Sequence, residues 1–193
     1  MSEENKTRKL LEMREEEPKK KTDSKWKKEL REWAVSIAVA LLAFVIIRSF
    51  LFTMIRVDGE SMIETLQDGD RLFVTVLDVK IGGVENEDVI ICKYPGEGST
   101  YFVKRVIAQP GQTVEIKDGV TYVDGVAREE EYVDHQTIID YGPYTVPEGK
   151  VFVMGDNRAN SRDSRKVGAL DDDLIVGQVR CIWWPLDRIG LVD

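Results

Sequence analysis

Ser61 lies in the stretch VDGESMIETL, a glycine-containing loop that follows closely on the one strongly apolar segment of the chain. A serine in such a loop ordinarily forms a turn, and it can also cap a helix or act as a nucleophile. A serine nucleophile needs a base that removes the proton of its hydroxyl group. Because the sequence contains a single histidine, His135, any Ser-His-Asp arrangement would have to include that residue.

Lys104 is an alternative base, in the run TYFVKRVIAQPG. Side chains alternate between the faces of a strand, so Lys104 shares a face with Phe102 and Val106. If that face is buried, desolvation lowers the pKa of the amine; a fall from about 10.4 to about 7 corresponds to roughly 4 kcal/mol. A neutral amine can take the proton of a serine hydroxyl. The local pattern alone favours a solvated lysine instead, with Arg105 or neither side chain pointing inward.

A third stretch, VMGDNRANSRDSRKVG, leaves a predicted strand and is too polar to be core. Taken alone, it is typical of a solvated loop held by local ion pairs. Its Ser161 hydroxyl could instead form a hydrogen bond with a neutral lysine amine and fix its direction. Asp163 and Arg165 are two residues apart, as are Asp156 and Arg158, so either pair could hold the loop through charge-assisted bonds.

Composition limits the class of protein. The chain has 193 residues, of which 42% are hydrophobic and 32% charged, as in a globular protein. Its net charge of -8 argues against binding to nucleic acid. Two distant cysteines, Cys92 and Cys181, have no metal-ligand spacing, so we expect no metal site. The sequence leaves open whether these two cysteines form a disulfide or are two buried thiols.

The N-terminal part predicts a membrane anchor. Residues 1–32 are charged and poor in apolar side chains, so we expect most of them to be disordered. Residues 33–55 are apolar on all sides, which predicts a transmembrane helix that is retained as an anchor. A buried core helix and a cleaved signal peptide are the alternatives. Seven basic residues lie between Lys19 and Arg31. The positive-inside rule then places the N-terminus in the cytoplasm and the chain from residue 56 outside.

Residues 56–193 predict a β-rich domain. Short runs rich in Val, Ile and aromatic residues are separated by Gly, Pro, Asp and Asn. Asp118-Gly119 and Asp124-Gly125 are typical of two-residue hairpin turns. The expected fold class is therefore mainly β, with a single N-terminal transmembrane helix followed by one β-rich domain.

The blocks GESMIETLQDGDRLFV, YFVKRVIAQPG and FVMGDNRANSRDSR follow one another after the apolar segment, and WWPLDRIG comes near the C-terminus. In this order they resemble the bacterial type I signal peptidases, over about residues 30–190. The resemblance implies the β-rich catalytic domain of that family and a membrane-bound serine endopeptidase. It implies cleavage of signal peptides from secretory precursors after small residues, at sites of the Ala-X-Ala type, without a metal or cofactor.

The resemblance also implies roles for particular residues. Ser61 matches the nucleophile, Lys104 its general base, and Ser161 the serine that orients that lysine. Asp163 and Arg165 match a structural ion pair behind the site.

The oxyanion and substrate sites follow from the same resemblance. The Ser61 N–H would donate to the oxyanion, whereas Gly59 stands where some members carry a hydroxyl as second donor; loss of one donor can cost about 2.7–4 kcal/mol. The apolar walls of the pockets for substrate positions P1 and P3 would be Val57, Met62, Leu66 and Phe102.

Two departures concern turn geometry. Glu64 stands where the family commonly has proline, which stiffens the turn after the nucleophile. Gln112 replaces the aspartate of a PGD turn.

His135 lies in a polar connection, and we expect no catalytic role for it. The Trp183–Trp184 pair either rests at a lipid interface or completes the core.

Two other classes of protein deserve comparison. A self-cleaving Ser-Lys regulator shares the dyad but would be expected to carry a DNA-binding domain in place of the apolar N-terminal segment. A membrane-anchored β module without activity, binding an extracytoplasmic partner, would also accommodate Gly59 and Glu64. Replacement of Ser61 and Lys104 by alanine discriminates between the enzyme and this module.

Overall fold

The computed structural model describes residues 22–50, 52–98, 100–133 and 139–192. The chain divides into two compact units, Met1–Ile46 and Ile47–Asp193. His135 and most of the predicted disordered tail lie outside the described residues.

Helix α2 (Thr22–Phe50) carries most of the predicted anchor. Trp33, Val39 and Phe44 are exposed on it, with more than half of each side chain's surface accessible. Within the residues described, however, none of the helices combines the length and the apolar composition that crossing a membrane requires. The transmembrane helix therefore stays a prediction.

The end of the predicted anchor differs from expectation. Strand β1 (Phe52–Arg56) includes the last four residues of the segment 33–55 and pairs antiparallel with β2 (Arg71–Thr75). The Phe52 and Phe73 rings stack across this pair, with centroids 4.9 Å apart. Apolar character alone does not distinguish a strand from a helix. The sequence pattern therefore predicted one continuous helix where the structure has a helix followed by a strand.

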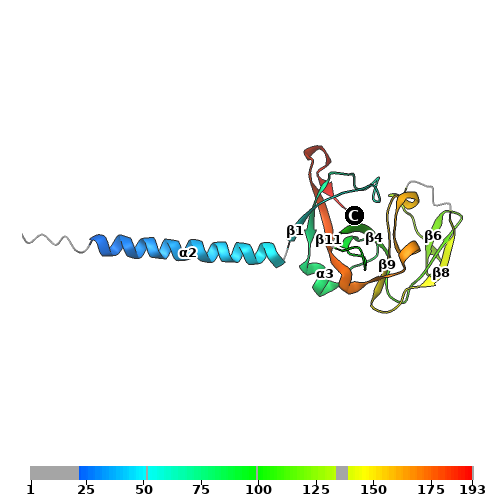
Figure 1. The fold of residues 1–193 in the computed structure, drawn as a ribbon, viewed down its shortest axis with the longest axis horizontal. Coiled ribbons are helices and arrows are strands. Elements are labelled where there is room, and N and C mark those ends of the chain that lie inside the picture. The colour runs from blue at the N-terminus through cyan, green and yellow to red at the C-terminus, as the bar shows by residue number, and fades with distance from the viewer. Residues whose placement is uncertain (1–21, 51, 99, 134–138, 193) are drawn as a thin grey trace, which may run out of the picture. The chain divides into compact units, whose positions relative to one another are not determined.

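The mainly β prediction is confirmed in the second unit (Figure 1). Within the described residues, the larger sheet has the strand order β1-β2-β11-β3-β4-β9-β10, with β12 paired to β11. Register shifts in β11, typical of β-bulges, bend and twist this sheet. Its further strands are β3 (Val89–Cys92), β4 (Phe102–Ala108), β9 (Lys150–Met154), β10 (Leu170–Asp171), β11 (Ile175–Trp184) and β12 (Gly190–Leu191).

The smaller sheet has the order β7-β6-β5-β8, and its β6 and β8 lie at the far end of the unit from β1 (Figure 1). Both predicted hairpin turns are confirmed: Asp118 and Asp124 have φ of 49° and 52°, and the glycine after each also has positive φ. The strands are β5 (Thr113–Lys117), β6 (Val120–Val123), β7 (Val126–Ala127) and β8 (Tyr141–Thr145).

Short helical elements connect the strands. The sequence did not predict them, because turns of three to six residues show little periodicity. They are α3 (Leu77–Gly82), α4 (Ser164–Val167), and the 3₁₀ turns η1 (Arg158–Asn160), η2 (Asp172–Leu174) and η3 (Leu186–Arg188).

Two strand edges stay open beside the loop that carries Ser61. Strand β1 ends the larger sheet, so one of its edges has no neighbouring strand among the described residues. Strand β4 pairs with β9 only from Arg105 onward, which leaves Phe102–Lys104 paired on the β3 side alone. An extended segment could add to either edge.

Candidate active site

The Ser61 loop is fixed at its entry by hydrogen bonds to the β2 side. The Val57 N–H donates to Asp70 O at 2.8 Å, and the Gly69 N–H donates back to Val57 O at 3.0 Å. Gly59 has φ of +108°, a conformation that favours glycine, and its N–H donates to Asp68 Oδ1 at 3.0 Å. The apolar cluster that includes Val57, Met62 and Leu66 ties the loop to the core.

Lys104 meets Ser61 in the middle of this site. A hydrogen bond of 2.7 Å joins Lys104 Nζ to Ser61 Oγ, and Nζ also donates to Val103 O at 2.8 Å. The lysine is only 2% exposed. Burial lowers the pKa of the amine, although Cys92, Asp163 and Asp156 act in the opposite direction. An amine that has lost its charge is a competent base for the hydroxyl 2.7 Å away.

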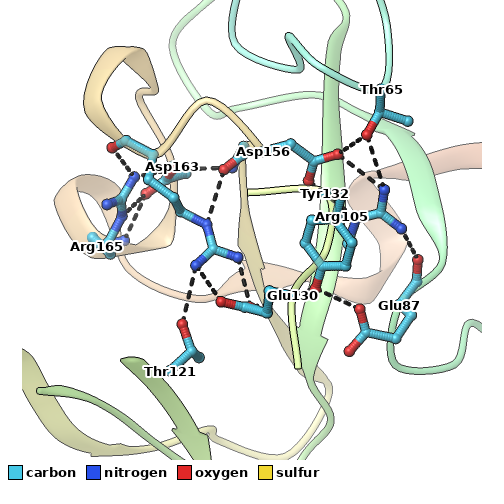
Figure 2. Close-up of polar contacts among 11 residues, drawn as sticks. Thr65, Glu87, Arg105, Thr121, Glu130, Tyr132, Asp156, Asp163 and Arg165 are labelled. Carbon is cyan, nitrogen blue, oxygen red and sulfur yellow. Dashed lines mark hydrogen bonds and ion pairs between the residues drawn. The ribbon is translucent and has the colours of Figure 1, made fainter. Parts of the chain in front are cut away.

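Arg105 is buried as well, on the opposite face of β4, and this was not expected. Its guanidinium donates to both carboxylate oxygens of Asp156, at 3.0 and 2.9 Å, and to Glu87 O at 2.8 Å. It lies 3.8 Å from the centre of the Tyr132 ring, and the same Asp156 accepts a bond of 2.6 Å from Thr65 in the Ser61 loop. Figure 2 shows how this pair links β4 to the loop.

The polar third block forms two separate ion pairs. Arg165 binds both oxygens of Asp163, at 2.9 and 2.8 Å. Burial is the largest single influence and raises the pKa of Asp163, but the bonds and charge of Arg165, together with smaller contributions such as the Gly155 N–H, hold the pKa below its ordinary value. The Asp156–Arg158 ion pair that the sequence spacing allowed does not form among the described residues. Arg158 instead binds Glu130 with two bonds of 2.7 Å, from a segment far away in the sequence (Figure 2).

Ser161 is buried close to the site, but among the described residues the lysine amine bonds to Ser61 and Val103 rather than to Ser161. It is 2% exposed, and within the described residues its hydroxyl has no hydrogen-bond partner. Gly155 explains how closely the two serines pack: a Cβ there would lie 2.4 Å from both Ser161 Oγ and Ser61 O. Gly155 was not predicted as a site residue, although a glycine directly after a strand is a signal of close backbone approach.

A cavity of about 300 Å³ opens beside Ser61. Three of the predicted pocket residues line it, whereas Leu66 is fully buried in the core and does not. The lining consists of Ile55, Arg56, Val57, Asp58, Gly59, Ser61, Met62, Thr100, Tyr101, Phe102 and Val103. The polar wall of Thr100 and Tyr101 was missed, because it lies in a connection that has no strand pattern.

The two sequence departures are accommodated locally. Glu64 is exposed, and the turn is held by the Leu66 N–H, which donates to Met62 O at 2.8 Å. The side-chain oxygen of Gln112 accepts the Gln109 N–H at 2.8 Å and closes its own turn.

Within the described residues no cluster of His, Cys, Asp and Glu could hold a metal ion. Both cysteines are free thiols.

A β fold that brings a serine hydroxyl to a desolvated lysine amine defines a serine peptidase of the Ser/Lys type. The family model "Signal peptidase, peptidase S26" matches residues 30–184, so the chain belongs to that family. The resemblance drawn from the three sequence blocks is confirmed, and the family favours the enzyme over the inactive module.

Two individual signal peptidases agree with this assignment, and one solved structure is also similar. Signal peptidase IB of Staphylococcus aureus (strain Mu50) is 38% identical over 180 residues, which cover 84% of this chain and 93% of that protein. Signal peptidase I T of Bacillus subtilis (strain 168) is 39% identical over 187 residues, with 91% and 93% covered. A crystal structure of a signal peptidase I from Enterococcus faecalis V583 has 32% identity and a TM-score of 0.45, covering 49% of this chain and 95% of its own.

Proposed function

We propose that this chain is a membrane-bound signal peptidase I, a serine endopeptidase that removes N-terminal signal peptides from secretory precursors through a Ser61–Lys104 dyad. The observation that carries the proposal is the 2.7 Å hydrogen bond between Lys104 Nζ and Ser61 Oγ, formed where the lysine is 2% exposed. Ser61 Oγ attacks the scissile carbonyl while Lys104 takes its proton. The acyl-enzyme is then hydrolysed by water, and the reaction requires no metal or cofactor.

The substrate binds as an extended segment between the open edges of β1 and β4. Main-chain hydrogen bonds give affinity, and the cavity beside Ser61 accepts alternate side chains. Val57, Met62 and Phe102 form apolar walls of that cavity, which supports a preference for small apolar residues at P1 and P3.

The apolar part of α2 anchors the enzyme in the cell membrane, with the N-terminus cytoplasmic and the β-rich unit outside. The basic residues before the apolar segment support this orientation. Ser61 follows the end of α2 at Phe50 by eleven residues (61 − 50), so the nucleophile stays close in sequence to the anchor. Trp184 is 44% exposed, which supports a place for it at the lipid interface.

The test uses the full chain in detergent with a precursor that carries an Ala-X-Ala site. Ser61→Ala and Lys104→Ala should each abolish cleavage at that site. Lys117→Ala is the matched control, because this lysine is exposed and lies on the smaller sheet. Cleavage that survives both dyad substitutions, in variants with unchanged circular dichroism, would exclude the proposed mechanism.

A further inference from the structure

Asn157 holds the loop of the nucleophile from two sides at once. Its backbone N–H donates to Ser61 O at 3.1 Å, and its side-chain Nδ2 donates to Glu60 O, also at 3.1 Å. Its Oδ1 accepts the Asn160 N–H at 3.1 Å and so caps η1. One residue therefore fixes two consecutive carbonyls of the loop while its own position is set by a cap.

Fixing the Glu60 carbonyl also fixes the N–H of Ser61. The two groups belong to one planar trans peptide and point in opposite directions. Within the described residues the Ser61 N–H has no acceptor, and Ser61 lines the cavity. The Glu60 carbonyl also accepts the Ile63 N–H, but at 3.3 Å, so the bond from Asn157 is the shorter of the two.

The direction of this N–H matters more here because the site has few other donors. Gly59 brings no hydroxyl group, and its own N–H is used by Asp68. The Ser61 N–H is then the donor on which an oxyanion at this site depends.

From these contacts we infer that Asn157 is a positioning residue that aims the Ser61 N–H at the oxyanion, an inference that rests on the proposed peptidase function. In the first step a bond forms between Ser61 Oγ and the carbonyl carbon. The hydroxyl proton passes to Lys104, and the electron pair of the C=O double bond moves to the oxygen. Asn157 touches none of these atoms and acts only through the 60–61 peptide.

Two substitutions remove the bond to Glu60 O and keep the cap. Asn157→Asp has the same shape and still offers an oxygen to the Asn160 N–H, but it has no Nδ2 donor. Asn157→Ser is uncharged and also caps, but it is too short to reach Glu60. The matched control is Asn160→Asp, which makes the same charge change in the same turn and replaces an exposed 3.3 Å bond to the Glu60 side chain by a solvent-screened repulsion between two carboxylates.

Kinetics of the full chain separate this role from a structural one. Loss of a whole oxyanion donor lowers kcat by about 10²–10³. A misdirected donor should therefore lower kcat by about 10- to 100-fold in both Asn157 variants, with KM within about twofold. The pH at which the rate reaches half its plateau should not move in Asn157→Ser, which adds no charge. In Asn157→Asp the new carboxylate favours the charged amine and should move that pH upward, if at all. Asn160→Asp should behave as the unchanged chain does.

A peptide aldehyde with an Ala-X-Ala sequence provides a second readout. Its carbonyl forms a tetrahedral adduct with Ser61. In the Asn157 variants its inhibition constant should therefore rise by the same factor by which kcat/KM falls. Partial unfolding would lower the number of sites that the aldehyde titrates, but not its affinity for the folded fraction.

The outcomes are distinguishable. Unchanged kcat and aldehyde affinity in both Asn157 variants, beside a chain whose cleavage depends on Ser61 and Lys104, would overturn this inference and leave the proposed function standing. A chain that does not cleave the precursor, or that cleaves it without Ser61, would overturn both. A loss of kcat and aldehyde affinity together, absent from Asn160→Asp, supports the inference.

Discussion

Replacing Glu130 by glutamine should destabilise the β-rich unit strongly, although the two side chains have the same shape. Glu130 binds Arg158 with two bonds of 2.7 Å, and the side chains are 8% and 1% exposed (Figure 2). The remaining partners of Arg158 are neutral: its Nη1 donates to Thr121 Oγ1 at 3.0 Å and its Nε to Gly155 O at 3.2 Å. The substitution leaves a buried cation without a directly bound counter-ion, because the carboxylate of Asp156, which also acts on Arg158, is already bound by Arg105.

The size of the effect follows from that burial. Removing one partner of a buried ion pair costs about 3–5 kcal/mol. Glutamine keeps one acceptor oxygen, so we expect the lower end, about 3 kcal/mol. For a protein of this size each kcal/mol corresponds to about 2–4 °C, so the unfolding midpoint should fall by about 6–12 °C.

The assay is thermal unfolding of the full chain in detergent, followed by near-ultraviolet circular dichroism. Glu129→Gln is the matched control, because Glu129 is exposed and its side chain has no partner within the described residues. Adding Arg158→Met to Glu130→Gln removes the stranded cation and should recover part of the loss. A midpoint for Glu130→Gln within 2 °C of the control, roughly 1 kcal/mol or less, would refute the reasoning.

Three further predictions concern the site. Because burial lowers the pKa of Lys104, kcat/KM should rise with pH as the amine loses its proton and level off below pH 10, the range of an ordinary lysine; a limb centred near 10 in a pH–rate profile would contradict this. Gly155→Ala should lower kcat at least tenfold in the same cleavage assay, because its Cβ would lie 2.4 Å from Ser61 O and must displace the nucleophile, and wild-type turnover would contradict it. Burial raises the pKa of Cys92 to about 12, so iodoacetamide at pH 8 should label Cys181 and spare Cys92 in the folded chain, as read by mass spectrometry.

The sequence predicted the strand that carries the lysine but not what surrounds it. Period-two alternation placed Lys104 on the face of Phe102 and Val106, and the lysine is buried at 2% exposure. The same pattern could not tell that Arg105, on the other face, is 1% exposed. Alternation says which residues share a face, whereas only tertiary packing decides whether the second face is covered.

Local sequence patterns could not predict the ion pairs that join residues far apart in the chain. Arg105 and Asp156 are separated by 51 residues, and Glu130 and Arg158 by 28. Spacing within the third block suggested Asp156 with Arg158, because neighbours in sequence are the partners that a local reading can offer. The register of β4 against β9, which sets Arg105 opposite Met154, brings the real partner close, and that register is a property of the whole sheet.

These pairs also have a consequence for the lysine. A carboxylate near Lys104 favours the charged amine, and both Asp156 and Asp163 act on it in this sense. Each of the two carboxylates is bound at both oxygens by its own arginine, Arg105 and Arg165. The paired guanidinium offsets much of the field of its carboxylate, so desolvation can dominate the pKa of the amine. In the proposed mechanism, this pairing of each aspartate with its own arginine favours an uncharged lysine beside two buried carboxylates.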